Sequence, residues 1–128
     1  MKVLVLGATG MLGHKLMQVL STRFQVIGTT RGEVSSYARH PVLGGMPLMG
    51  KVHAEKFDSV VRAFAETKPH VVVNGIGIIK QLSAAKDPIP SLTINALFPH
   101  QLAQLCQGAN ARLIHISTDC VFSGRKGN

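Results

Sequence analysis

Three glycines at three-residue intervals, Gly7, Gly10 and Gly13, constrain the fold more than any other feature of the sequence. They separate an apolar run at residues 3–6 from residues 11–20, where apolar side chains recur at helical spacing. A glycine turn between a strand and a helix directs backbone N–H groups and the positive helix end at one point, where a pyrophosphate binds. The candidate contact residues here are Gly7, Thr9, Gly10, Met11, Leu12 and Gly13. A purely structural glycine turn is the alternative, but the flanking strand and helix favour dinucleotide binding.

Short β-branched runs alternate with amphipathic stretches along the rest of the chain. The pattern predicts strands at residues 3–6, 24–29, 51–53, 70–74 and 113–117, helices at 11–20, 57–67 and 91–107, and a short helix or loop within 31–50. Strands that are apolar throughout require a parallel sheet covered on both faces. We therefore predict a doubly wound α/β Rossmann fold with strand order 3-2-1-4-5 and a ligand crevice between the first and fourth strands.

The helical periods also predict which side chains face the core. The first helix should bury Leu12, Leu16, Val19 and Leu20, the second Phe57, Val60, Val61 and Phe64, and the third Ile94, Leu97, Phe98, Leu102 and Leu105. Pro99 should kink the third helix, and Pro69 should stop the second.

The 128 residues carry a formal net charge of +8, which suits an anionic partner. The basic residues are dispersed and only 5% of residues are aromatic, which disfavours nucleic acid and leaves a phosphorylated small molecule or a solvated surface. The apolar stretch at residues 71–79 is too short and too interrupted to span a bilayer. The first residues lack a signal-cleavage pattern, so we expect a cytoplasmic protein.

Other chemistries find little support in the sequence. Cys106 and Cys120 are expected to be reduced thiols, and the six histidines form no metal-ligand spacing, so no metal site is predicted. The Gly-x-Ser-x-Gly and P-loop patterns do not occur in residues 1–128, which disfavours serine hydrolases and P-loop NTPases.

Two segments at expected strand ends complete the candidate cofactor site. Arg31 follows the second strand where a ribose selector is expected, and its guanidinium could pair with a 2′-phosphate, which favours NADP(H) over NAD(H). A solvated arginine is the alternative. Asn74, Gly75 and Ile76 end the fourth strand and could border a nicotinamide ribose, or could form only a loop entry.

Ser117, Thr118 and Asp119 follow the last predicted strand at the same sheet edge. A hydroxyl there could donate a hydrogen bond to a substrate carbonyl as negative charge develops on its oxygen. A helix cap or a turn is the plainer interpretation of these residue types.

Several of these segments together resemble the extended short-chain dehydrogenase/reductases, and most closely their dTDP-4-dehydrorhamnose reductase branch. The resemblance rests on residues 7–13, 68–74 and 94–96 and, most specifically, on the run at 115–122. It implies an NAD(P)H-dependent oxidoreductase of dTDP-rhamnose biosynthesis that reduces a nucleotide-linked 4-keto-6-deoxysugar. It also implies that Thr118 is the catalytic hydroxyl, that the three glycines hold the pyrophosphate and that Arg31 holds the 2′-phosphate.

The sequence departs from this family pattern in two places. His53 stands where an acidic residue usually holds adenine, and the Tyr-x-x-x-Lys pair is not found, since Tyr37 is the only tyrosine. We therefore expect residues 1–128 to be an N-terminal cofactor domain, truncated after the fifth strand, inactive alone and without the substrate-binding region. The exposed edge of the fifth strand would favour a homo-oligomer. A nonenzymatic NADP-binding regulatory subunit and a nucleotide-sugar epimerase or dehydratase are the alternatives.

Overall fold

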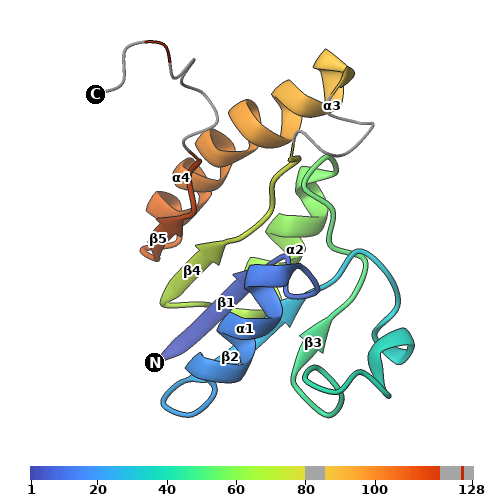
Figure 1. Cartoon of the computed structure of the whole chain (residues 1–128). Helices are drawn as coiled ribbons and strands as arrows, with labels where there is room; N and C mark the ends of the chain where they lie inside the picture. The colour runs from blue at the N-terminus through green and yellow to red at the C-terminus, as the bar shows by residue number, and fades with distance from the viewer. Residues whose placement is uncertain (80–85, 119–124, 126–128) are drawn as a thin grey trace.

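Five parallel strands form one sheet in the computed structural model, which describes residues 1–79, 86–118 and 125. The strands are β1 (Lys2–Leu6), β2 (Gln25–Thr29), β3 (Leu48–Met49), β4 (Val71–Asn74) and β5 (Arg112–His115) (Figure 1). Their order is β3-β2-β1-β4-β5, and every neighbouring pair is parallel. The predicted doubly wound topology is confirmed, with β1 at the centre of the sheet.

Side chains of β1 alternate between two core layers, one on each face of the sheet. Val3 and Val5 pack in the layer beneath helix α1 (Met11–Leu20), together with Met17 of that helix. Leu4 and Leu6 pack in the opposite layer, which is covered by α2 (Phe57–Thr67) and α4 (Phe98–Gly108) (Figure 1). Both faces are thus covered, as continuously apolar strands require.

Helix α2 ends where the sequence predicts. Lys68 adopts the left-handed conformation with a φ of 47° and donates its N–H to the Phe64 carbonyl, and Pro69 follows. This left-handed residue ends the helix and turns the chain directly into β4.

The predicted single helix at residues 91–107 is instead three consecutive segments. They are α3 (Pro88–Leu92), the π-helical turn η3 (Thr93–Leu97) and α4, in which Pro99 lies in the first turn. The Phe98 N–H donates to the Thr93 carbonyl, five residues earlier, and the extra residue in this turn rotates the helix before Pro99. Ile94 and Phe98 face the core as predicted, whereas Leu97 is 52% exposed, contrary to the prediction.

The third strand also differs from the prediction. It lies at Leu48–Met49 rather than at residues 51–53, because Lys51 has a φ of 57° and this left-handed conformation cannot continue a strand. His53 instead opens a turn that ends at Lys56. The short helix expected within residues 31–50 is the 3₁₀ turn η1 (Val34–Tyr37).

Three further side chains predicted to face the core are exposed: Leu12, Val19 and Val61. In α1 the buried positions are Gly13 and Met17, because the helix is turned to place Gly13 against the loop that follows β1. In α2 the buried positions are Val60, Ala63, Phe64 and Thr67, which leaves Val61 at the margin of the buried face.

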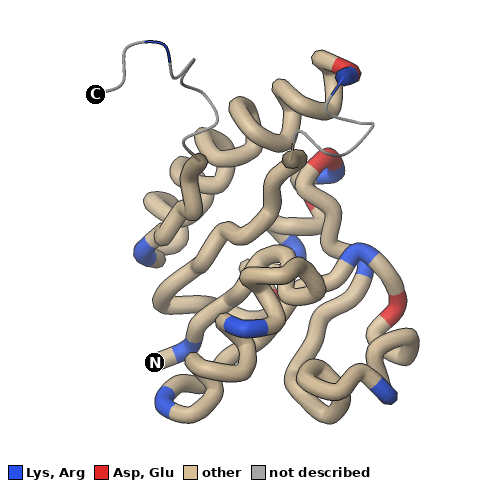
Figure 2. Tube along the Cα trace, in the orientation of Figure 1, with Lys and Arg blue, Asp and Glu red and all other residues tan. Residues whose placement is uncertain are grey.

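Strand β5 lies at one end of the sheet, and Ile114 and Ile116 are exposed there. Self-association through this edge stays a prediction. Lysines and arginines are scattered over several elements and form no continuous stripe along the described chain (Figure 2). Among the described residues, no helix is both long and apolar enough to cross a membrane. Cys106 is a buried free thiol, while Cys120 and Asp119 lie outside the described residues.

Candidate cofactor-binding site

A cavity of about 440 Å³ opens at the carboxyl edge of the sheet, beside the ends of β1, β2 and β4. This volume is in the range of small-molecule sites. Six sequence-predicted residues line it: Gly7, Thr9, Gly10, Arg31, Gly75 and Ile76. The other lining residues are Thr29, Thr30, Val52, Ala54, Glu55, Gly77, Ile78, Pro90 and Ile94. The cavity lies at the predicted switch point, where ligands of open α/β sheets bind.

The glycine loop that forms one wall of the cavity is held by the end of β2. The Gly7 N–H donates to Thr29 Oγ1 at 3.2 Å, and the Ala8 N–H donates to the Thr29 carbonyl at 3.0 Å. Gly7 has a φ of 79°, and a Cβ there would lie 3.0 Å from Ile76 Cγ1. Glycine is therefore required at this position both for the backbone conformation and for the approach of the loop after β4.

Helix α1 points its N-terminus at this loop, with Gly10 as the N-cap residue. Backbone N–H groups in the first turn of a helix have no intrahelical acceptor, so the start of α1 offers donors and a positive dipole end to an anion. The side chains of Met11 and Leu12 are exposed and do not line the cavity. Cofactor binding by these two residues stays a prediction, and only their backbone lies at the glycine loop.

Gly13 supports the cavity from behind rather than lining it. A Cβ at Gly13 would overlap the Gly7 carbonyl oxygen and lie 2.9 Å from Ala8 Cα. Absence of a side chain at this position allows α1 to pack against the glycine loop.

Arg31 lies at the mouth of the cavity and forms an ion pair with Glu55, with 3.3 Å between Arg31 Nη2 and Glu55 Oε1. Glu55 was not predicted as a site residue, and it is the one carboxylate among the described lining residues. No local pattern could reveal it, because the two residues are 24 positions apart in the sequence.

Asn74 is fully buried and does not line the cavity, but it holds residues that do. Its Oδ1 accepts a hydrogen bond from the Ile76 N–H at 3.1 Å, and its Nδ2 lies 3.1 Å from Nδ1 of His115 on β5. The Gly75 N–H donates to the Leu6 carbonyl. The loop after β4 is therefore fixed to both neighbouring strands.

Asn95, in the π-helical turn, fixes the other side of the same loop. Its Oδ1 accepts from the Ile78 N–H at 2.8 Å, and its Nδ2 donates to the Ile78 carbonyl at 2.9 Å. Asn95 belongs to the family-like segment at residues 94–96, but its sequence position predicts no role for it. The spacing of apolar residues does not reveal a π-helical turn within an expected α-helix. The contact between Asn95 and Ile78 could therefore not be predicted.

Thr118, the predicted catalytic hydroxyl, is exposed and does not line the cavity. It follows β5 by three residues, so it lies beyond the carboxyl end of the strand next to β4. Its catalytic role stays a prediction.

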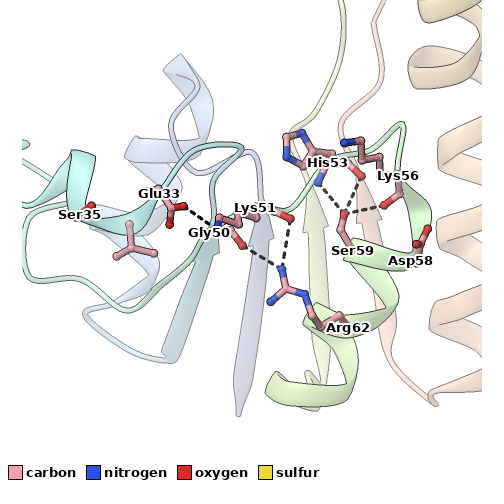
Figure 3. Close-up of a pocket in the computed structure, with 10 residues that line it drawn as sticks. Glu33, Ser35, Gly50, Lys51, His53, Lys56, Asp58, Ser59 and Arg62 are labelled. Carbon is pink, nitrogen blue, oxygen red and sulfur yellow. Dashed lines mark hydrogen bonds and ion pairs between the residues drawn. The ribbon is translucent and has the colours of Figure 1, made fainter.

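A second, wider hollow of about 880 Å³ lies beside the start of α2 (Figure 3). Its charged side chains include the Lys51–Glu33 ion pair, and its Ser59 hydroxyl is bonded to the backbone. The described residues contain no group of three His, Cys, Asp or Glu side chains that could hold a metal ion. Burial raises the pKa of the Cys106 thiol to about 11, but this residue is part of the core and lines neither cavity.

Comparison with known proteins gives consistent matches. A curated dTDP-4-dehydrorhamnose reductase from Streptomyces griseus is 32% identical over 126 residues, which are 97% of this chain and 35% of that protein. The crystal structure of a hypothetical dTDP-4-dehydrorhamnose reductase from Sulfolobus tokodaii superposes with a TM-score of 0.79 at 26% identity, over 100% of this chain and 43% of that one. The dTDP-4-dehydrorhamnose reductase of Bacillus anthracis, solved in complex with NADP, shares the fold with a TM-score of 0.74 at 24% identity, over 97% of this chain and 38% of that one.

The chain thus spans about a third of the length of its curated relative. The sequence model of the RmlD substrate binding domain matches residues 1–128, the whole chain. The chain therefore belongs to the RmlD substrate binding domain family.

Proposed function

We propose that residues 1–128 form the NAD(P)-binding Rossmann domain of an NADP(H)-dependent reductase. Its substrate would be a nucleotide-linked 4-keto-6-deoxysugar, as in a dTDP-4-dehydrorhamnose reductase. The observation that carries this proposal is one cavity bounded by the glycine loop and by Arg31. The S. griseus relative supports the reaction class. The B. anthracis reductase of the same fold holds NADP, while the choice of NADP for this chain rests on Arg31.

The described residues fit a dinucleotide along the cavity. Three of the lining residues, Gly7, Gly10 and Gly75, carry no side chain that could occupy the space of a ligand. Backbone N–H groups at the start of α1 would hold the pyrophosphate, and Arg31 would hold the 2′-phosphate. Gly75 and Ile76 would border the nicotinamide ribose in the position that Asn74 fixes.

When bound, NADPH supplies a hydride to the sugar carbonyl carbon. In our proposal the Thr118 hydroxyl donates a hydrogen bond to the carbonyl oxygen and stabilises the negative charge that develops there, while the proton itself comes from another group. Residues 1–128 contain no Tyr-x-x-x-Lys pair to protonate that oxygen, so we expect no sustained turnover from this segment alone. Sustained oxidation of NADPH by residues 1–128 with a dTDP-4-keto-6-deoxysugar would contradict this expectation.

Calorimetric titration with NADPH and NADH tests the cofactor assignment. Arg31→Gln should weaken NADPH binding about tenfold or more, because a charged hydrogen bond contributes roughly 1.5–3 kcal/mol, and should change NADH binding about threefold at most. Arg39→Gln is the matched control, since it removes the same charge from an exposed arginine that does not line the cavity. Equal losses for both cofactors in Arg31→Gln, or a wild-type preference for NADH, would overturn the NADP assignment.

A further inference from the structure

The ion pair between Arg31 and Glu55 lies at the mouth of the cofactor cavity, and both residues line it. The Arg31 side chain is 76% exposed and that of Glu55 is 38% exposed. Exposed pairs of this kind contribute little to stability. The placement of a carboxylate beside the expected phosphate ligand therefore calls for a functional explanation.

The backbone on either side of Arg31 is tied to the segment that carries Glu55. The Thr30 N–H donates to the Met49 carbonyl at 2.9 Å, and the Val52 N–H donates to the Thr30 carbonyl at 3.0 Å. A third bond, of 3.2 Å, joins the Lys51 N–H to the Gly32 carbonyl. The two loops are thus held together on both sides of Arg31, which keeps the backbone segments that carry the two charged residues close to each other.

Glu55 itself is carried by a braced turn. The turn is closed by the Lys56 N–H, which donates to the His53 carbonyl at 3.1 Å. Ser59 Oγ accepts the His53 N–H at 2.8 Å and lies 2.7 Å from the Lys56 carbonyl oxygen (Figure 3). One serine on α2 therefore holds both ends of the turn.

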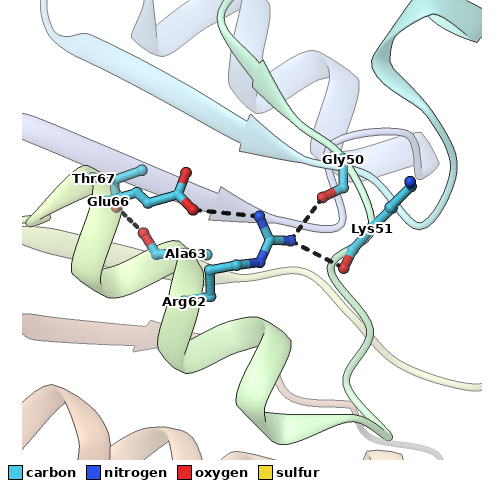
Figure 4. A network of polar contacts seen from close by, with 6 residues as sticks. All are labelled: Gly50, Lys51, Arg62, Ala63, Glu66 and Thr67. Carbon is cyan, nitrogen blue, oxygen red and sulfur yellow. Dashed lines mark hydrogen bonds and ion pairs between the residues drawn. The ribbon is translucent and has the colours of Figure 1, made fainter.

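The start of the same segment is held by Arg62. Its Nη2 donates to the Gly50 and Lys51 carbonyls at 3.1 and 3.3 Å, while Nη1 pairs with Glu66 (Figure 4). The segment that presents Glu55 is therefore fixed before the turn as well as within it. These contacts hold the backbone that carries the Glu55 carboxylate beside the cavity.

Two forms of adenosine ribose need opposite partners at this point. A 2′-phosphate needs a cation and is repelled by a carboxylate, whereas a free 2′-hydroxyl is held by a carboxylate that accepts its hydrogen bond. No carboxylate is present where β2 ends, because the residues there are Thr29, Thr30 and Arg31. Glu55 supplies one from a different loop.

We propose that Arg31 and Glu55 act as a two-way ribose selector, in which Arg31 binds a 2′-phosphate and Glu55 accepts a hydrogen bond from a 2′-hydroxyl. This inference rests on the proposed function, because it concerns the adenosine end of that cofactor site. Glu55 competes with the 2′-phosphate for the Arg31 guanidinium and so limits the preference for NADP(H). The site then binds both NADP(H) and NAD(H), and the charge of Glu55 sets the ratio of the two affinities.

Calorimetric titration with two adenosine probes, adenosine 2′,5′-bisphosphate and 5′-AMP, measures this ratio without the nicotinamide half. Glu55→Gln keeps the size of the side chain but removes its charge, so binding of the bisphosphate should strengthen about three- to tenfold at low salt. Binding of 5′-AMP should weaken about threefold, because an amide oxygen is a poorer acceptor than a carboxylate. The gain for the bisphosphate should shrink at high salt.

Glu33→Gln is the matched control, because Glu33 forms a comparable exposed ion pair with Lys51 but does not line the cofactor cavity. It should leave the ratio of the two affinities unchanged. A Glu55→Gln variant that weakens the bisphosphate would show that Glu55 only positions Arg31, and equal changes for both probes would show a purely structural role. Either result overturns the selector while leaving the cofactor assignment standing. If the wild-type chain binds neither probe, both the selector and the cofactor assignment are wrong.

Discussion

Replacing Gly13 with alanine tests whether the contact between α1 and the glycine loop requires a residue without a side chain. The added methyl group would overlap the Gly7 carbonyl oxygen and lie 2.8 Å from the Gly7 carbonyl carbon. The opposing atoms belong to the backbone, so no side chain can rotate away and the helix must shift. Overpacking typically costs about 1–3 kcal/mol, and we expect a cost near 3 kcal/mol here. Alanine regains about 1 kcal/mol of helix propensity, which leaves a net loss of about 2 kcal/mol.

Urea unfolding followed by far-ultraviolet circular dichroism measures this loss as a lower midpoint with an unchanged slope. The matched control is Gly108→Ala, at the last residue of α4, where a Cβ would meet no heavy atom within 4 Å. This control should be as stable as the wild-type chain or up to about 1 kcal/mol more stable. A Gly13→Ala variant that unfolds at or above the wild-type midpoint would refute the reasoning. NADPH binding should weaken as well, since the displaced helix carries the backbone donors.

Three further predictions concern the supports of the site and the core. Asn74→Ala should lower the free energy of unfolding by about 1–3 kcal/mol, because the half-buried Ile76 N–H loses its acceptor; an unchanged urea midpoint would contradict this. Ser59→Ala should cost about 1–2 kcal/mol in the same assay, since the His53 N–H loses its partner, and a neutral effect would show that the turn holds without it. Because the folded-state pKa of Cys106 is raised from 9.0 to about 11, stability should be constant with respect to this group below pH 9 and fall as the pH rises toward 11. The urea midpoint of the wild-type chain should therefore be lower at pH 11 than at pH 9, and the difference should be smaller in Cys106→Ala. An equal difference in the two proteins would exclude the thiol as the cause.

The positions of β1 and β4 could be predicted because most of their residues are buried, whereas β3, with two half-buried residues, lies outside its predicted range. Val72 on β4 and Leu4 on β1 are fully buried, and runs of such residues leave little choice between a parallel sheet and other arrangements. The glycine loop was predictable for a different reason, because Gly7, Gly10 and Gly13 are close together in the sequence.

The rotation of the helices could not be predicted from the apolar period. The close contact at Gly13 turns Leu12 and Val19 outward, and the extra residue in the π-turn turns Leu97 outward. Both effects depend on backbone contacts that the spacing of apolar residues does not encode. A helical period alone describes which residues share a face, but not which face meets the sheet.

The candidate site was predictable only in part. Its glycine loop and Arg31 follow strands directly, so their positions could be inferred from strand ends. Glu55 could not, because its place beside Arg31 depends on a left-handed residue at Lys51 and on a turn braced from α2. Thr118 follows its strand as expected, and its catalytic role stays a prediction.

The central position of β1 has a consequence for how this chain folds during synthesis. Val3 pairs with Val26 on one side and with Val71 on the other, so one flank of β1 closes a loop roughly three times longer than the other. Loop-closure entropy makes the second pairing about 1 kcal/mol more costly than the first. The emerging chain therefore joins β1 to β2 early, and the other edge of β1 remains open until β4 leaves the ribosome. Ribosome-bound chains should accordingly acquire resistance to proteolysis in two steps, and the second should require β4.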